Sequence, residues 1–194
     1  MFVFIIIILI LFLIFYNLIN TEVKYVKSDI DNKEYLVRDL DDATQAAALL
    51  SNLKRRMIKV TEHLYKNKDA MYIENKDYID NLYKKVKKGV VISENSSETN
   101  YTSYSVNKGE ELVFCLRSRK KDRNNEFHDL NLLTYVLLHE MAHIACPEYG
   151  HTPLYNNIFG FITTVAIQIG EYNKIDFYQN NTEYCGMTIT SSIV

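Results

Sequence analysis

A motif of the form H-E-x-x-H constrains this chain more than any other feature of its sequence. It comprises His139, Glu140 and His143, and it lies in a run whose apolar residues recur with helical spacing. On an α-helix, residues four apart lie on one face a turn apart, so the two imidazoles can bind one metal ion. Glu140 projects about 100° further round the helix, where it can accept a proton from a metal-bound water. We therefore predict a zinc ion held by two histidines, with Glu140 as general base.

The segment around the motif carries the signals of a helix of ordinary length. Asn131 or Asp129 can cap its start, and Pro147 follows its end. Its apolar stripe comprises Leu132, Leu133, Val136, Leu137, Met141 and Ile144. The alternative is a core helix that happens to carry three polar residues, which the specific spacing makes the weaker interpretation.

A zinc site of this kind needs a third protein ligand and leaves the fourth position to water. We favour His151, which follows a short loop in which Pro147 ends the helix and Gly150 permits a tight reversal. Glu171, at the end of a helix predicted over residues 153 to 171, is an alternative. Cys146 is another candidate, although a cysteine at such a position more often serves as a small packing residue.

The residues before the motif predict two helices and a small sheet. Apolar residues recur with helical spacing over residues 42–66 and 76–88, with charged residues on the opposite faces. Strands are expected over 90–94, 101–106 and 111–119, and the last two are separated by a turn typical of a hairpin. The fold class expected is α+β, with a small sheet packed on helices that include the H-E-x-x-H helix.

Four segments carry a resemblance to a known family. They are Ile92-Ser93-Glu94, the stretch from Glu111 to Arg119 with its L-R-x-R ending, Leu133 to His143, and Gly150-His151 with Tyr155 four residues on. In these segments the chain resembles the WLM family of zinc metallopeptidases, relatives of the SprT-like proteases. The resemblance covers a little over a third of the chain. It implies a zincin-like fold, peptidase activity and a metal-binding role for His151.

The chain departs from the family in the loop between the second and third histidines. Seven residues separate His143 from His151, more than is usual in the family, so the loop must fold back to bring the third ring to the metal. Tyr155 stands where the family has Phe or Trp, and we expect it to pack the following helix rather than touch substrate.

The amino-terminal segment predicts a transmembrane helix over residues 1–20. Residues 1–16 contain no charged side chain, and the apolar stretch reaches the length that a bilayer requires. A cleaved signal peptide is the alternative, but the basic start and the small-residue cleavage site are missing. Four basic residues follow the segment, at Lys24, Lys27, Lys33 and Arg38. The positive-inside tendency then places the metallopeptidase domain, residues 21–194, in the cytosol.

Composition and cysteine usage support one folded domain behind this anchor. The hydrophobic fraction is 47%, with only two prolines and six glycines, and the net charge of −2 gives no general attraction to nucleic acid. Cys115, Cys146 and Cys185 are odd in number and widely spaced, which predicts no disulfide scaffold and fits a reducing compartment. The three N-x-S/T sequons are interpreted as incidental.

Two local features admit a functional and a structural interpretation. A basic cluster is more simply a solvated loop than a nucleic-acid contact, and it consists of Arg117, Arg119, Lys120, Lys121 and Arg123. Near the carboxyl end, Tyr184 either packs the core or donates a hydrogen bond to the oxyanion that forms when water attacks a peptide carbonyl.

Together these features predict a membrane-anchored metallopeptidase that uses one Zn²⁺ and acts on protein or peptide substrates. His139, His143 and His151 are the predicted ligands, and Glu140 is the predicted catalytic residue. One alternative is a protease that acts on proteins attached to DNA. Another is a zinc-binding interaction module without activity.

Overall fold

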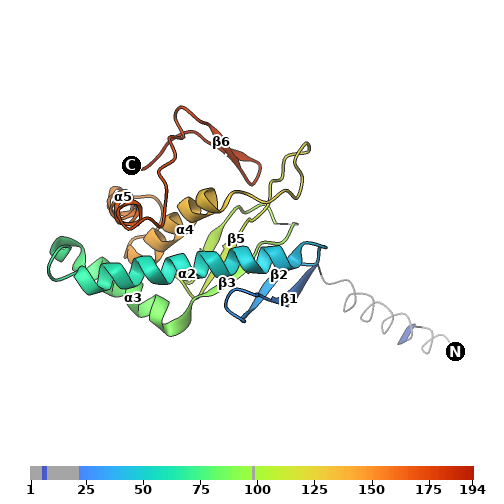
Figure 1. The fold of residues 1–194 in the computed structure, drawn as a ribbon, viewed down its shortest axis with the longest axis horizontal. Coiled ribbons are helices and arrows are strands. Elements are labelled where there is room, and N and C mark those ends of the chain that lie inside the picture. The colour runs from blue at the N-terminus through green and yellow to red at the C-terminus, as the bar shows by residue number, and fades with distance from the viewer. Residues whose placement is uncertain (1–5, 8–21, 98) are drawn as a thin grey trace.

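Helix α2 (Ala43–Asn67) is the longest element of the described fold, and it runs across the folded part of the chain in Figure 1. The computed structural model describes residues 6–7, 22–97 and 99–194. The buried face of α2 follows the helical period and includes Ala46, Leu50, Leu53, Met57, Val60 and Leu64. The helix predicted over residues 42–66 is therefore confirmed.

Helix α3 (Lys76–Gly89) packs beside α2 after the short 3₁₀ turn η1 (Ile73–Asn75). It buries Ile79 and Leu82 and ends at Gly89, whose φ of 104° is the left-handed conformation that glycine adopts readily. This helix agrees with the one predicted over residues 76–88.

The central sheet has three strands in the order β3-β5-β4. Strands β3 (Val91–Glu94) and β5 (Glu111–Phe114) are parallel, and β4 (Tyr104–Val106) pairs antiparallel with β5. The predicted hairpin is confirmed, and β4 forms an edge of the sheet. Strand β5 ends earlier than predicted because the backbone N–H of Cys115 donates to the hydroxyl of Ser103 instead of continuing the ladder.

Helices α4 (Leu130–Ala145) and α5 (Pro153–Gln168) complete the core. The carboxylate of Asp129 caps α4 by accepting the N–H groups of Asn131 and Leu132. Thr152 caps α5 through its hydroxyl, and Pro153 occupies the first turn, where its missing N–H costs nothing. Because α4 contacts α2, α3, α5 and β4, it is buried on most of its surface.

Two hairpins are absent from the sequence prediction. Strands β1 (Val23–Lys27) and β2 (Glu34–Arg38) pair antiparallel and pack on α2. Strands β6 (Thr182–Tyr184) and β7 (Met187–Ile189) form a second antiparallel pair near the carboxyl end of the chain, which we call the C-terminal hairpin (Figure 1). Each strand has only three to five residues, too few for alternation to stand out in the sequence.

A disulfide joins the C-terminal hairpin to the end of β5. It links Cys115 to Cys185 across 70 residues of chain, with their Cα atoms 6.1 Å apart. The prediction that the cysteines form no disulfide is therefore wrong, because tertiary packing brings together two cysteines whose spacing gives no sign of pairing. Cys146 is a free, buried thiol.

The predicted transmembrane helix is wrong as an element of the described fold. Among residues 6–7, 22–97 and 99–194, no helix is both long enough and apolar enough to cross a bilayer. The segment at issue, residues 1–20, lies outside the described residues except for Ile6 and Ile7. The apolar helices α4 and α5 have 16 residues each, the length of buried core helices. The architecture of the described residues is thus α+β without a membrane-spanning helix.

Candidate metal centre

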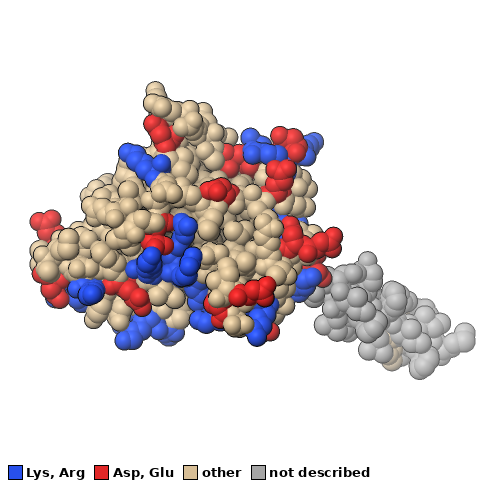
Figure 2. Space-filling model, in the orientation of Figure 1, with Lys and Arg blue, Asp and Glu red and all other residues tan. Residues whose placement is uncertain are grey.

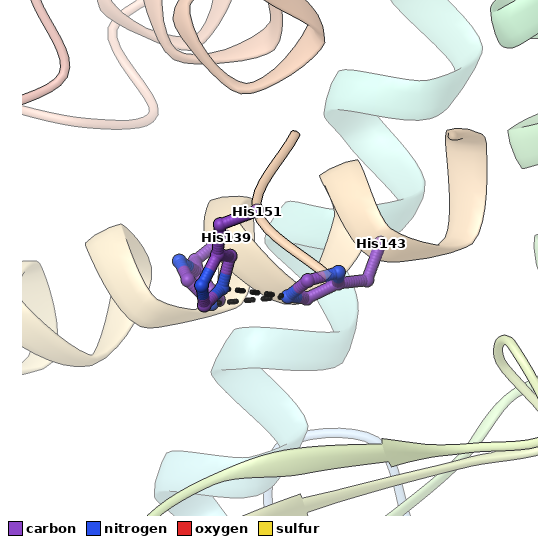
Figure 3. A group of neighbouring side chains, drawn as sticks. All are labelled: His139, His143 and His151. Carbon is purple, nitrogen blue, oxygen red and sulfur yellow. Dashed lines mark hydrogen bonds between the residues drawn. The ribbon is translucent and has the colours of Figure 1, made fainter. Parts of the chain in front are cut away.

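Three imidazoles converge at one point beside helix α4. His139 and His143 lie one turn apart on α4, and His151 reaches them from the loop before α5 (Figure 3). Each pair of Nε2 atoms is 3.2 Å apart, so the three nitrogens form an equilateral triangle. The structure thus brings together the three residues that the sequence analysis proposed as ligands.

This triangle has the dimensions of a tetrahedral metal site. Ligand bonds of about 2.0 to 2.1 Å at tetrahedral angles place two nitrogens about 3.3 to 3.4 Å apart, close to the observed 3.2 Å. Three neutral imidazoles cannot all form hydrogen bonds with one another in this arrangement, because each ring has one N–H and all three Nε2 atoms face the same point. A cation at the centre, bound through three lone pairs, accounts for the geometry, so the residues present fit one zinc ion.

The environment favours the neutral imidazole, which is the form that binds metal. Burial, with smaller contributions from the other two histidines, lowers the pKa of His139 to about 3. Burial also lowers the pKa of His143 to about 4, assisted by His151 and by the ammonium group of Lys108. Both rings are therefore available as ligands at neutral pH.

Glu140 lies next to the triangle, and its side chain is shielded from bulk water. The residue is 4% exposed, and burial raises the pKa of its carboxyl group to about 7. It lines both cavities that border the histidines. A carboxyl group with this pKa can both accept and release a proton near neutral pH.

The loop between the second and third histidines is held by a lysine from the sheet. The ammonium group of Lys108, in the turn between β4 and β5, donates to the carbonyl oxygens of Cys146 and Pro147 at 2.8 Å and of Glu148 at 3.0 Å. Gly150 then turns with a φ of 79° toward His151. These contacts explain how a longer loop folds back. Lys108 was not among the residues predicted to belong to the site.

Tyr155 packs against the rings of the three histidines. Its ring stacks on His143 with centroids 4.2 Å apart and also contacts the rings of His139 and His151. Its hydroxyl donates to the carbonyl oxygen of His139 at 3.2 Å. The sequence predicted that Tyr155 packs the following helix, and in the structure its ring also contacts all three imidazoles. The sequence signal for this role was the position of Tyr155, four residues after His151.

The other ligand candidates lie elsewhere. The carboxylate of Glu171 pairs with the ammonium group of Lys59, on α2. Cys146 is buried among apolar residues of the core, although it follows α4 directly. Within the described part of the chain, the group of side chains that can hold a metal ion consists of the three histidines.

One member of the predicted basic loop lies in the interior. Arg117 is 3% exposed, and its guanidinium group donates to Glu94 and Asp42 at 2.7 Å each. The interpretation of the whole cluster as a solvated loop is therefore wrong for Arg117. On the face shown in Figure 2, basic and acidic side chains are interspersed rather than gathered by sign.

Two cavities meet at the metal centre. One, of about 470 Å³, extends along β4 toward Lys108 and Tyr149. The other, of about 310 Å³, extends toward the C-terminal hairpin and is bordered by Tyr184. The hydroxyl of Tyr184 is 2.5 Å from that of Ser103, which gives Tyr184 a packing role in the cavity wall. Together the two cavities form one cleft, and the histidines lie where its two halves meet.

The chain is similar to viral proteins whose names state no function. No model of a known protein family matches it, and no solved structure does. It is 24% identical over 166 residues to the uncharacterized protein 136R of Invertebrate iridescent virus 6, which covers 82% of this chain and 85% of that protein. It is 40% identical over 175 residues to the uncharacterized protein R325 of Acanthamoeba polyphaga mimivirus, covering 90% of this chain and 86% of R325. This chain therefore belongs to the same protein family as R325.

Proposed function

We propose that the protein is a zinc-dependent peptidase that hydrolyses peptide bonds. The observation that carries this proposal is the triangle of imidazole nitrogens, 3.2 Å on each side, with the buried Glu140 beside it in a cleft. His139, His143 and His151 would hold the ion. The resemblance to the WLM family supports the same activity, and the zincin relationship is part of this proposal.

Each group at the site has a distinct task in such a reaction. An ion held by the three histidines would supply a water molecule of lowered pKa for the attack and would polarise the peptide carbonyl. Glu140 would take a proton from the attacking water and deliver it to the leaving amine. Tyr155 keeps the ligand rings in register through its stacking on His143.

The position of the sheet favours a peptide as substrate. Strand β4 is an edge strand of the central sheet, and residues before, within and after it line the cleft. An extended peptide can add to this edge through main-chain hydrogen bonds, which hold its backbone without requiring one particular side chain. Such pairing places a substrate carbonyl beside the histidines.

The disulfide bears on where the domain acts. Disulfides form and persist under oxidising conditions. The predicted cytosolic placement does not fit such conditions, and it depended only on the basic residues that follow the predicted transmembrane helix. The domain is therefore proposed to act with Cys115 and Cys185 bridged. Thiol labelling of the protein taken directly from its host cells tests this, since the bridged form exposes no reactive sulfur from either cysteine.

The test of the activity is a pair of matched glutamate variants of the full chain. Glu140→Gln removes the base but no metal ligand, so cleavage of an unfolded protein such as casein should fall by about 10²- to 10⁴-fold while bound zinc is retained. Glu74→Gln, an exposed glutamate of η1, is the control and should match the wild type. Equal turnover in Glu140→Gln would contradict the assigned mechanism.

The same assay separates the two rival functions. Cleavage that requires added DNA would favour a protease acting on DNA-attached proteins. A wild-type chain that binds one zinc but cleaves nothing would favour a zinc-binding interaction module.

A further inference from the structure

A third cavity, of about 360 Å³, lies where three strands end. Its lining includes Arg38 as the last residue of β2, Glu94 as the last residue of β3, and Cys115 directly after β5. Strands β3 and β5 are parallel, so their carboxyl ends lie at the same edge of the sheet. In open sheets with parallel strands, ligands often bind outside this edge. Among the described residues, none that lines this cavity also lines the two cavities at the metal centre, so it is a separate candidate site.

We call this space the arginine cavity, because basic and polar side chains dominate its lining. Its described arginines are Arg38, Arg117 and Arg119, and its described asparagines are Asn95, Asn124 and Asn125. The last two asparagines reach the cavity because the loop after β5 folds back, and the N–H of Asn125 donates to the carbonyl oxygen of Ser118 at 3.1 Å. A lining rich in guanidinium and amide groups fits a ligand that accepts hydrogen bonds and carries negative charge.

The described lining contains one carboxylate, that of Glu94, and its oxygen atoms are already in use. They accept the Nε–H of Arg117 at 2.7 Å and the backbone N–H of Arg38 at 2.8 Å. Two further carboxylates, of Asp42 and Glu22, lie outside this lining. The first binds Arg117 at 2.7 Å, and the second binds two serines that line the cavity. The nearby acids are therefore engaged with groups of the protein itself.

Guanidinium N–H groups beside the arginine cavity lack acceptors. Within the described part of the chain, Nη2 of Arg117 and Nε of Arg38 are buried and have no hydrogen-bond partner. Arg117 is 3% exposed, and its guanidinium group is held over the ring of Phe127, 4.0 Å from the ring centroid. Arg119 forms no ion pair with a described residue, and its Nη2 lies 3.5 Å from the carbonyl oxygen of Ser96. Because a buried donor without an acceptor is unfavourable, a ligand that supplies anionic oxygen atoms would satisfy these groups.

We propose that the arginine cavity binds a small molecule that carries a phosphate group and hydroxyl groups, such as a sugar phosphate or a nucleotide. The guanidinium groups of Arg38 and Arg119 bind the phosphate oxygens, because their planar N–H forks match the geometry of a phosphate. The side chains of Asn95, Asn124 and Asn125 bind the hydroxyl groups. The volume of about 360 Å³ lies in the range of small-molecule sites and leaves room for more than a phosphate ion. This site is independent of the proposed peptidase function.

The first experiment measures binding by isothermal titration calorimetry. Ribose 5-phosphate, adenosine 5′-monophosphate, inorganic phosphate and ribose are each titrated into the full chain. We expect a dissociation constant below about 1 mM for at least one of the two organic phosphates, and at least about tenfold weaker binding of inorganic phosphate and of ribose. The tighter of the two organic phosphates shows whether the ligand resembles a sugar phosphate or a nucleotide. Absence of binding by both organic phosphates, or equally tight binding of inorganic phosphate, overturns the inference.

Arginine variants locate the binding site. Arg119→Met changes a half-buried residue and should weaken binding of the organic phosphate by at least about tenfold, because it removes charged donors. Arg119→Lys keeps the charge but not the planar fork and should bind with intermediate affinity. Arg55→Met, at an exposed position of α2, is the control and should keep the wild-type affinity. Arg38→Met is a second variant of the site, and urea unfolding shows that each variant is folded. Unchanged affinity in both Arg119→Met and Arg38→Met overturns the inference.

A control separates the arginine cavity from the metal centre, since a phosphate also binds to metal ions. The titration is repeated with wild-type protein from which metal has been removed by a chelator. We expect the affinity for the organic phosphate to change less than about twofold, because no described lining residue is shared between the two sites. Loss of binding on metal removal would place the phosphate at the histidines and overturn the inference. Either result leaves the peptidase proposal to its own test with Glu140→Gln.

Discussion

Helix α4 and the C-terminal hairpin line the same apolar cavity, but different interactions hold them in place. Helix α4 is packed by α2, α3, α5 and β4, so its position follows from the hydrophobic core. The hairpin has two three-residue strands. It adds Tyr184 and Cys185 to the buried core and is further attached by a disulfide and a few polar contacts. The residues of the proposed chemistry on α4 are therefore held by extensive core packing, whereas the position of the hairpin depends also on the disulfide.

The largest expected effect comes from opening the disulfide. Replacing Cys115 and Cys185 by serine should lower the free energy of unfolding by up to about 4 kcal/mol, because the bridge closes a loop of 70 residues. Urea unfolding measures this change, with Cys146→Ser as the control for loss of a thiol. Zinc affinity should change less than about twofold, since no ligand lies on the hairpin. A large loss of zinc affinity in the double variant would show that the two walls are coupled.

Removing the third ligand should affect the metal centre and leave the hairpin unchanged. His151→Ala is expected to weaken zinc binding by more than about 100-fold, beyond what loss of a group that only orients a ligand costs. Competition with a chromophoric chelator gives the affinity, and His63→Ala on α2 is the matched control. If Glu171→Gln rather than His151→Ala releases the metal, the assignment of the third ligand is wrong.

A smaller effect on zinc binding is expected from Lys108, which connects the sheet to the loop before His151. Lys108→Met removes the donor to three carbonyl groups before His151 and should weaken zinc binding by about 10-fold. Lys108→Arg should restore much of the affinity, and Lys84→Met, an exposed lysine of α3, should have no effect. Unchanged affinity in Lys108→Met would mean that the loop holds its shape without this contact.

The smallest effect concerns acid sensitivity of the hairpin. His128 is buried and accepts the N–H of Cys185 at 3.1 Å, and burial lowers its pKa below the ordinary value of 6.5. The unfolded chain therefore binds a proton before the folded chain does, so stability is lost as the pH falls below about 6.5. The loss per pH unit is at most about 1.4 kcal/mol for this one group.

His128→Gln is the test of this assignment. It keeps a side-chain acceptor without a titrating group, so its unfolding free energy should depend less on pH than that of the wild type between pH 6.5 and 5. An identical slope in the two proteins would assign the acid sensitivity to other titrating groups.

The sequence predicted the helices and the central sheet well, for a physical reason visible in single residues. Leu50, Leu53 and Met57 on α2 recur with the helical period because one side of the helix is buried. The β1–β2 and β6–β7 hairpins gave no such signal, since their strands are too short for a period to emerge. Arg117 was misjudged because its partners Glu94 and Asp42 are distant in the sequence.

The sequence by itself determined the core of the candidate site. The positions of His139, Glu140 and His143 relative to one another follow from the geometry of a single helix, which neighbouring residues specify. Only the tertiary structure decided that His151 completes the triangle, that Lys108 holds its loop, and that a disulfide fixes the C-terminal hairpin. These features depend on contacts between segments far apart in the chain, and such contacts form only when burial of the common core brings the segments together.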